Sequence, residues 1–239
     1  AGVCTFKDLK GAVDTVIDSS QIGLPLSRIE LLDEVQIKAI NQYKKASHEV
    51  GPTLFVEIQG TPLGVKEQSE IFKEIANTNN ALKFQWSDRS EEIEVLWSAR
   101  HDAYYAALSL APGKKAFTTD ICVPISKLTD CILETKKDIE KSNIIAPIVG
   151  HVGDGNFHLI MLLDPENEKE VSEAKLLNDK LVNRALKMEG TSTGEHGIGI
   201  GKKEYLKIEQ GLSVEVMSQI KKAIDPKNIM NPGKIFEIN

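Results

Sequence analysis

The chain has 239 residues, of which 41% are hydrophobic and 27% are charged, and its formal net charge is −6 at pH 7. This composition is ordinary for a globular protein with a core, and the interspersed, slightly acidic charges argue against nucleic acid or an anionic membrane surface as the main partner. No apolar run reaches the roughly 20 residues of a transmembrane segment. Cys4, Cys122 and Cys131 lack C-x-x-C spacing and cannot all pair, so we expect reduced thiols.

Patterns typical of helices and strands alternate along the chain. An apolar stripe that includes Phe6 and Val13 predicts a first helix over residues 5–19. Further helices are predicted over residues 34–48, 65–78, 90–110, 127–141, 168–188 and 214–224. Asp33 and Ser126 are the expected N-caps of the helices that follow them. Strands are predicted over residues 27–32, 53–60, 82–86, 116–124, 144–151 and 156–163.

This order of elements predicts an α+β fold, in which an antiparallel sheet carries helices packed on one face. We expect one domain over residues 1–239, because no internal repeat or low-complexity linker is visible in the sequence. The glycine-rich residues 190–201 are expected to form a loop. The sequence lacks the dinucleotide fingerprint G-x-G-x-x-G after a strand, and it lacks G-x-x-x-x-G-K-[ST].

Two segments carry most of the chemical information, G-H-V-G-D-G-N-F-H at residues 150–158 and G-E-H-G-I-G at residues 194–199. A tight turn between the first two histidines would bring both imidazoles to one point. With Glu195, His151 and His158 would then supply three ligands for zinc or manganese and leave a position open for water or substrate. The alternative is that His158 packs in the sheet and His151 is a hydrogen-bonded turn residue.

Two further residues are candidates for the site. His196 adjoins Glu195, and an imidazole suits proton transfer near neutral pH; alternatively it is a fourth ligand or an orienting group. Arg100 lies on the helix predicted over residues 90–110, and a guanidinium can hold a carboxylate through two parallel hydrogen bonds. A surface salt bridge with a neighbouring acid is the alternative for Arg100.

These motifs resemble the C-terminal half of the FAD-linked 2-hydroxy-acid dehydrogenases, a group of vanillyl-alcohol-oxidase-like flavoproteins. The resemblance covers nearly the whole chain, from R-I-E-L-L-D at residues 28–33 through W-S-A-R-H-D-A-Y-Y-A at 97–106 to M-N-P-G-K at 230–234. The segment T-T-D-I-C-V-P-I-S at 118–126 is most similar to the mitochondrial, cytochrome-linked D-lactate dehydrogenase branch. The resemblance implies a ferredoxin-like core.

The resemblance also implies roles for the motif residues. His151, His158 and Glu195 would hold a divalent metal that grips the hydroxyl and carboxylate of the substrate, and His196 would take the hydroxyl proton while hydride leaves for the flavin. This is consistent with the chemistry, because a Lewis acid lowers the pKa of an alcohol and the flavin carries two electrons. Arg100 would hold the substrate carboxylate.

Three more residues receive roles by the same resemblance. Asn156 would lie close to both the substrate and the flavin ring, and Asn231 would reach back toward the flavin. Thr118 stands about where the hydroxyglutarate-oxidising members use a lysine for a second carboxylate. A short monocarboxylate such as D-lactate is therefore the expected substrate.

The family binds FAD mainly through an N-terminal domain, which we expect to lie outside this chain, so that the isolated chain would bind FAD poorly and turn over slowly or not at all. The expected electron acceptor is cytochrome c or a quinone, and a homodimer is possible. The expected location is the mitochondrial matrix or inner membrane in a eukaryote, and the cytoplasm or the periphery of the inner membrane in a bacterium. A metal-dependent hydrolase and a non-catalytic metal-binding module are the alternative functions.

Overall fold

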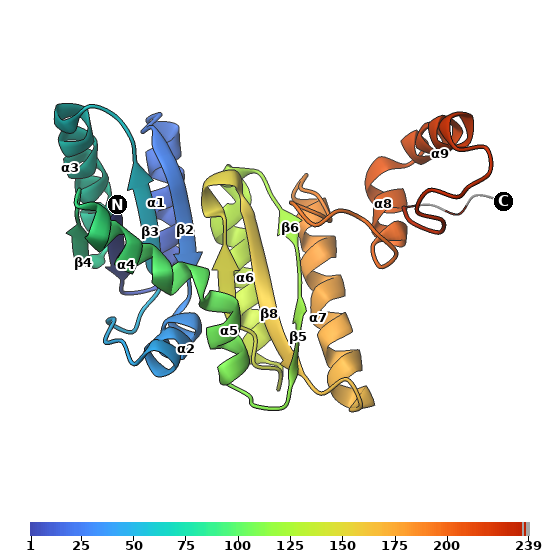
Figure 1. Cartoon of the computed structure of the whole chain (residues 1–239), viewed down its shortest axis with the longest axis horizontal. Coiled ribbons are helices and arrows are strands. Elements are labelled where there is room, and N and C mark those ends of the chain that lie inside the picture. Colours follow the sequence, from blue (N-terminus) through green and yellow to red (C-terminus); the bar gives the residue numbers. More distant parts are fainter. Residues whose placement is uncertain (236, 238–239) are drawn as a thin grey trace.

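A computed structural model describes residues 1–235 and 237 and shows an eight-stranded antiparallel sheet (Figure 1). The strands are β1 Gly2–Phe6, β2 Leu26–Leu32, β3 Thr53–Ile58, β4 Ala81–Trp86, β5 Lys115–Thr118, β6 Ile121–Cys122, β7 Ile148–Gly150 and β8 Asn156–Leu163. Their order across the sheet is β4-β1-β3-β2-β7-β8-β5, and β6 also pairs with β8. Every pairing is antiparallel.

Helices cover both faces of this sheet. They are α1 Leu9–Gln21, α2 Glu34–Lys44, α3 Pro62–Thr78, α4 Ser90–His101, α5 Ala103–Ser109, α6 Leu128–Glu140, α7 Glu168–Lys187, α8 Lys203–Gln210 and α9 Ser213–Ile224. Side chains alternate along a strand, so on β3 Leu54 belongs to the core that includes residues of α1, α3, α6 and α7, whereas Phe55 belongs to the core that includes residues of α2, α4 and α5. The predicted α+β architecture is confirmed, with a second layer of helices in addition to the expected one.

The first half of the chain is a ferredoxin-like unit. Its elements β1-α1-β2-β3-α3-β4 have the βαββαβ order, and its strands lie in the order β4-β1-β3-β2. The second half repeats this topology. Its first strand is formed by β5 and β6, and α6, β7, β8 and α7 follow in the same order as in the first unit. Thr191 forms a single bridge to Cys122 at the place where a fourth strand would pair. β2 and β7 join the two units. The repeat is one of topology, which the sequence does not display.

Four sequence predictions differ from the structure. Residues 2–6 form β1 instead of entering a helix, because a strand buried on both faces lacks polar alternation. The helix predicted over residues 90–110 is broken at Asp102 into α4 and α5. Ser126 is not an N-cap, since it lies inside a short 3-10 turn at Ile125–Lys127 that precedes α6. Helix α8 was not predicted, because its eight residues are fewer than the window over which a helical apolar pattern is read.

The structure bears on two expectations drawn from the composition, the state of the cysteines and the absence of a transmembrane segment. Cys4, Cys122 and Cys131 are free thiols, and burial raises the pKa of both Cys4 and Cys131 to about 12, which leaves these two thiols protonated and inert. Among the described residues, no helix combines the length and the apolar character needed to cross a membrane.

The buried N-cap of α2 is confirmed and provides a test of the fold. Asp33 Oδ1 accepts a hydrogen bond from the amide of Gln36 at 2.9 Å, and its Oδ2 accepts one from Lys136 Nζ on α6 at 2.9 Å. Asp33→Ala removes the cap and one of the two carboxylate partners of Lys136, which keeps its ion pair with Glu34, so we expect the free energy of unfolding to fall by about 2–3 kcal/mol. Asp33→Asn keeps a cap acceptor and should cost less. Chemical denaturation followed by circular dichroism measures both.

The difference in stability between the wild type and Asp33→Asn should depend on pH. Burial raises the pKa of Asp33 to about 6, above its unfolded value of 3.8, although Lys136 opposes the shift. Stability from this carboxyl is therefore fully present below about pH 4 and is lost as the pH rises through about 6. The stability of the wild type relative to Asp33→Asn should fall between pH 4 and pH 7. A rise over that interval would contradict the burial of an ionisable carboxyl at this position.

Candidate active site

The candidate catalytic side chains gather at the hairpin between β7 and β8. The connection Val152–Asp154 is a single 3-10 turn. Gly155 closes it with a φ of 78°, and a Cβ at this position would lie 2.1 Å from the carbonyl oxygen of Val123, so only glycine fits. The rings of His151 and His158 approach to 5.8 Å between centroids. The hairpin therefore brings the two imidazoles together, as the sequence predicts.

His158 is buried and held in one orientation. Its Nδ1 lies 2.8 Å from the carbonyl oxygen of Thr119. Because a carbonyl oxygen can only accept, Nδ1 carries the hydrogen and Nε2 is left with the lone pair in the neutral ring. Burial lowers the pKa of His158 and favours that neutral ring. Its Nε2 lies 3.1 Å from Glu195 Oε1.

His151 is oriented in the same sense by a carboxylate. Its Nδ1 lies 2.7 Å from Oε1 of Glu30 on β2, and its Nε2 lies 3.5 Å from Glu195 Oε1. The hydrogen bond with Glu30 raises the pKa of His151. Both histidines therefore use Nδ1 within the protein and direct Nε2 toward the same carboxylate oxygen.

This arrangement fits a divalent metal. The Nε2 atoms of His151 and His158 and a carboxylate oxygen of Glu195 all lie within 4.8 Å of one another. Two imidazole lone pairs facing a carboxylate oxygen are mutually unfavourable unless a proton or a cation lies among them. Two histidines with one carboxylate form a common ligand set for catalytic zinc, and metal-binding histidines usually donate their other ring hydrogen to a carboxylate or a carbonyl.

The buried carboxylate of Asp120 holds the loop that carries Glu195. The amides of Gly194, Glu195 and His196 donate to it at 3.0, 3.2 and 3.0 Å. Thr193 Oγ1 donates at 2.7 Å, Asn156 Nδ2 at 3.0 Å and Lys202 Nζ at 3.2 Å. Burial raises the pKa of Asp120, but these hydrogen bonds and the charge of Lys202 outweigh it and hold the pKa well below its usual range.

His196 lies on the open side of the cluster. Its ring centroid is 5.4 Å from that of His158, and its Nε2 is 3.4 Å from Glu195 Oε1. The side chain of His196 is 56% exposed and that of Glu195 48%, whereas His158 is 6% exposed. His158 thus lies toward the sheet, whereas Glu195 and the imidazole of His196, which could accept a proton, lie toward solvent.

Arg100 reaches the same cluster from the last turn of α4. Its Nε and Nη2 atoms lie 3.1 and 3.0 Å from Glu30 Oε2. This partner is a buried acid on a distant strand, not a neighbouring surface acid. The Nε–Nη2 edge of the guanidinium is therefore used inside the protein. Within residues 1–235 and 237 no hydrogen bond or ion pair engages Nη1, so the end of the fork can receive a carboxylate.

The other predicted site residues are spread more widely. Thr118 is exposed on β5 opposite Ile160, on the same face of the sheet as His158. Asn156 is buried, with both amide hydrogens given to Asp120 and to the carbonyl of Ile121 and with its Oδ1 unpaired. That oxygen is a candidate contact for a ligand, while the amide nitrogen has a structural role.

Asn231 lies outside the cluster. It belongs to the segment after α9, which Figure 1 shows beyond α8, away from the sheet. That segment is tied to the glycine-rich loop through the amide of Ile235, which donates to the Gly199 carbonyl at 2.7 Å. Among the described contacts, none joins Asn231 to His151, His158 or Glu195.

Sequence reasoning missed Glu30 and Asp120, the two carboxylates that orient the cluster. Glu30 is 8% exposed and Asp120 3% exposed. Glu30 is flanked by Ile29 and by two leucines in β2, and Asp120 directly precedes the apolar run I-C-V that begins with β6. A buried acid requires a partner, and that pattern was the available signal. The partners themselves lie too far along the chain to be identified from it.

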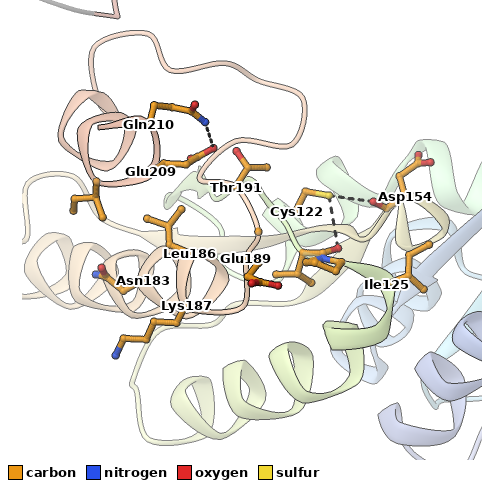
Figure 2. A pocket seen from close by; sticks show the side chains of 14 residues that line it. Cys122, Ile125, Asp154, Asn183, Leu186, Lys187, Glu189, Thr191, Glu209 and Gln210 are labelled. Atoms are coloured by element: carbon orange, nitrogen blue, oxygen red, sulfur yellow. Dashed lines mark hydrogen bonds between the residues drawn. The ribbon is translucent and has the colours of Figure 1, made fainter. Parts of the chain in front are cut away.

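A separate hollow of about 950 Å³ lies beside α7 and α8 and is not part of the histidine cluster (Figure 2). Cys122 lies in its wall, and its thiol donates to the carbonyl of Asp154 at 3.1 Å. Burial raises the pKa of Cys122, so the thiol is a poor nucleophile. The hollow is lined by none of the predicted site residues, so the cluster at the hairpin remains the candidate site.

Comparison with known proteins gives a consistent family. Residues 1–235 match the model of FAD linked oxidases, C-terminal domain. The chain is 47% identical over its whole length to a probable mitochondrial D-lactate dehydrogenase of Danio rerio, covering 48% of that protein. It is 42% identical to a mitochondrial D-lactate dehydrogenase [cytochrome] of Arabidopsis thaliana, over 98% of the chain and 41% of the relative. The chain thus spans about half the length of these curated relatives.

Solved structures support the fold. A 4-ethylphenol oxidase from Gulosibacter chungangensis superposes with a TM-score of 0.72 at 13% identity, over 98% of this chain and 53% of that one. A p-cresol methylhydroxylase gives a TM-score of 0.68 at 14% identity, over 99% of this chain and 52% of that one. At these identities the likeness concerns the arrangement of the elements alone.

Asp120→Asn tests how the loop is held. An amide offers one acceptor oxygen in place of two and presents an NH₂ group to backbone N–H donors. Hydrogen bonds to a charged group are worth about 1.5–3 kcal/mol each. We therefore expect hydrogen exchange of the amides at residues 194–196 to accelerate by about 100-fold or more, while the β1–β3 amides stay protected.

The matched control for Asp120→Asn is Asp130→Asn, which changes an exposed carboxylate on α6. Hydrogen exchange followed by mass spectrometry or NMR distinguishes the two variants. Unchanged protection at residues 194–196 in Asp120→Asn would show that the loop is held by other contacts.

Proposed function

Because the chain belongs to the FAD-linked oxidase C-terminal domain family, we propose that it is the substrate-binding half of a flavin-dependent dehydrogenase. The proposed reaction is oxidation of D-lactate, or a similar short D-2-hydroxy acid, to the 2-keto acid. The observation that carries the proposal is the convergence of His151, His158 and Glu195, with His196 beside them and a free edge of Arg100 nearby. The relatives named as D-lactate dehydrogenases support the choice of substrate.

His151, His158 and Glu195 would hold a zinc or manganese ion through two Nε2 atoms and a carboxylate oxygen. When bound, this ion supplies Lewis acidity that lowers the pKa of the substrate hydroxyl. Glu30 and the Thr119 carbonyl keep both Nε2 atoms directed at this point. The chain's own contribution is a ligand set whose geometry is fixed before binding, which reduces the cost of reorganisation.

Proton removal falls to His196. Its Nε2 lies beside Glu195 on the exposed side of the cluster, where a substrate hydroxyl held at the metal position would meet it. Asp120 accepts from the backbone amide of His196, which restrains the main chain and leaves the imidazole free to take the hydroxyl proton. The flavin would accept the hydride that leaves the carbon bearing this hydroxyl.

Selection of the substrate falls to Arg100 and Thr118. The free end of the Arg100 guanidinium offers two parallel N–H groups to one carboxylate. Thr118, on the same face of the sheet, is neutral, so a second carboxylate would receive no compensating charge from it. A short monocarboxylate agrees with this pair better than a dicarboxylate does.

The rest of the assembly is proposed from the resemblance to the family. FAD would be bound mainly by a domain outside this chain, which would cover the exposed side at Glu195 and His196, with Asn156 and Asn231 as candidate contacts. The acceptor of the electrons would be cytochrome c or a quinone, and the location would be mitochondrial, in keeping with the names of the relatives from Danio rerio and Arabidopsis thaliana.

Flavin reduction in the full-length protein tests the reaction. With FAD and zinc or manganese bound, D-lactate should bleach the flavin absorbance in a stopped-flow experiment. His196→Gln removes the base and should slow this reduction by about 10²–10⁴-fold, and His151→Ala should abolish it together with stoichiometric metal binding. His48→Gln, far along the chain from the cluster, is the control and should leave the rate unchanged.

The alternative functions predict different results in this experiment. A hydrolase that uses this cluster would act without flavin, and a binding module would take up the metal with no flavin reduction by any short D-2-hydroxy acid. Failure of D-lactate to bleach a flavin-loaded, metal-loaded wild type would overturn the proposed reaction.

Thr118→Lys tests the basis of substrate choice. A lysine on this face of β5 would offer a charge to a second carboxylate, so we expect the ratio of kcat/KM for D-2-hydroxyglutarate to that for D-lactate to rise by about tenfold or more. Thr118→Gln has a long but neutral side chain and serves as the control. An equal rise in both variants would indicate that bulk, rather than charge, sets the preference.

A further inference from the structure

We propose that Glu30 is a positioning residue that couples the metal-binding half of the site to the carboxylate-binding half. This inference rests on the proposed function and assigns a role to a residue that lies outside both halves. Glu30 contacts His151 through one carboxylate oxygen and Arg100 through the other. It thereby sets the direction of both groups at once.

The position of Glu30 is unusual for an acid. It lies in the middle of β2, directly opposite Phe55, and so points into the core that is shared with α2, α4 and α5. Leu31 and Leu32 beside it are fully buried. An ionised carboxylate in such surroundings is costly unless it is paired and hydrogen-bonded. Burial of this kind would not be needed merely to attach α4 to the sheet, since apolar side chains there already do so.

The two oxygens of Glu30 have separate partners. Oε1 lies 2.7 Å from His151 Nδ1, and Oε2 lies 3.0 and 3.1 Å from Arg100 Nη2 and Nε. A carboxylate that only neutralised the arginine could turn both oxygens toward the guanidinium. Here one oxygen is reserved for the histidine, so the same rigid group determines the ring orientation of His151 and the plane of Arg100.

The effect on Arg100 follows from the shape of the guanidinium. The group is planar, with its donors in a fixed fork, so holding the Nε–Nη2 edge also fixes the direction of the Nη1–Nη2 end. The effect on His151 follows from its tautomer, because a hydrogen on Nδ1 leaves the Nε2 lone pair for a metal. One buried carboxylate thus aligns the atom that would bind the metal with the fork that would bind the substrate carboxylate.

Glu30→Gln is the discriminating variant because it is isosteric yet cannot satisfy both partners. Its single oxygen can accept from either His151 or Arg100, and its NH₂ group then faces a donor on the other. In the full-length, FAD-loaded protein we expect Zn²⁺ affinity, measured by chelator competition, to fall by about 10–100-fold. We also expect KM for D-lactate to rise by about tenfold.

The double variant separates the two effects. In an Arg100→Met background the increase in KM caused by Glu30→Gln should disappear, whereas the loss of Zn²⁺ affinity should persist, because only the first effect acts through the guanidinium. Asp102→Asn is the matched control. It breaks the ion pair with Lys44 at the end of α4 and leaves Glu30 untouched, so Zn²⁺ affinity should stay at the wild-type value.

A purely structural role for Glu30 gives a different result. Glu30→Gln would then lower the melting temperature, while the folded protein kept its Zn²⁺ affinity and its KM, and that outcome would overturn the inference. The affinity measurement also keeps it separate from the proposed reaction. If the wild type does not reduce its flavin with D-lactate, the reaction is refuted, and the Zn²⁺ affinities of wild type and Glu30→Gln still decide the part played by Glu30 at His151.

Discussion

Three successive backbone amides, at residues 194–196, point at the carboxylate of Asp120, and the geometry of the site depends on that interaction. Neighbouring N–H groups directed at one point repel one another unless an anion receives them. Asp120 supplies the anion, and Lys202 balances its charge from the residue before α8. The loop needs glycine at 194, because a Cβ there would lie 2.0 Å from Asn156 Nδ2. The direction in which Glu195 leaves the loop therefore follows from a buried charge in the connection between β5 and β6.

The two histidines illustrate how similar residues are given different properties by their partners. His158 donates to a neutral carbonyl and is buried, and its pKa is lowered by that burial. His151 donates to a carboxylate and is one-third exposed, and that hydrogen bond raises its pKa. A carboxylate partner increases the basicity of the far nitrogen more than a carbonyl does. The cluster is thus asymmetric, with the more basic ring beside Glu30 and Arg100.

The sequence is informative about local features and less so about long-range partners. The glycine-rich turn between two strand-forming runs predicts the hairpin and the meeting of His151 with His158, because both are decided by residues close along the chain. The strand β1 is not predicted, and its residues 5 and 6 fall in the predicted first helix, because a strand buried on both faces shows no polar alternation. Glu30 and Asp120 were not recognised, because their partners lie 70 to 121 residues away in one case and 36 to 82 in the other.

Within residues 1–235 and 237, a single bridge at Thr191 takes the place of the fourth strand of the second ferredoxin-like unit, shortly before the loop that carries Glu195. The contacts that orient the cluster join segments that are distant in sequence, with a separation of 121 residues for Glu30 and His151 and of 75 for Asp120 and Glu195. Closing such loops is slow, because the contacts that offset the entropy of closure form only late in folding. During synthesis the ligand set is incomplete until the loop beyond Thr191 has left the ribosome. A nascent chain with both units half formed therefore has no complete set of ligands with which to capture a metal ion prematurely.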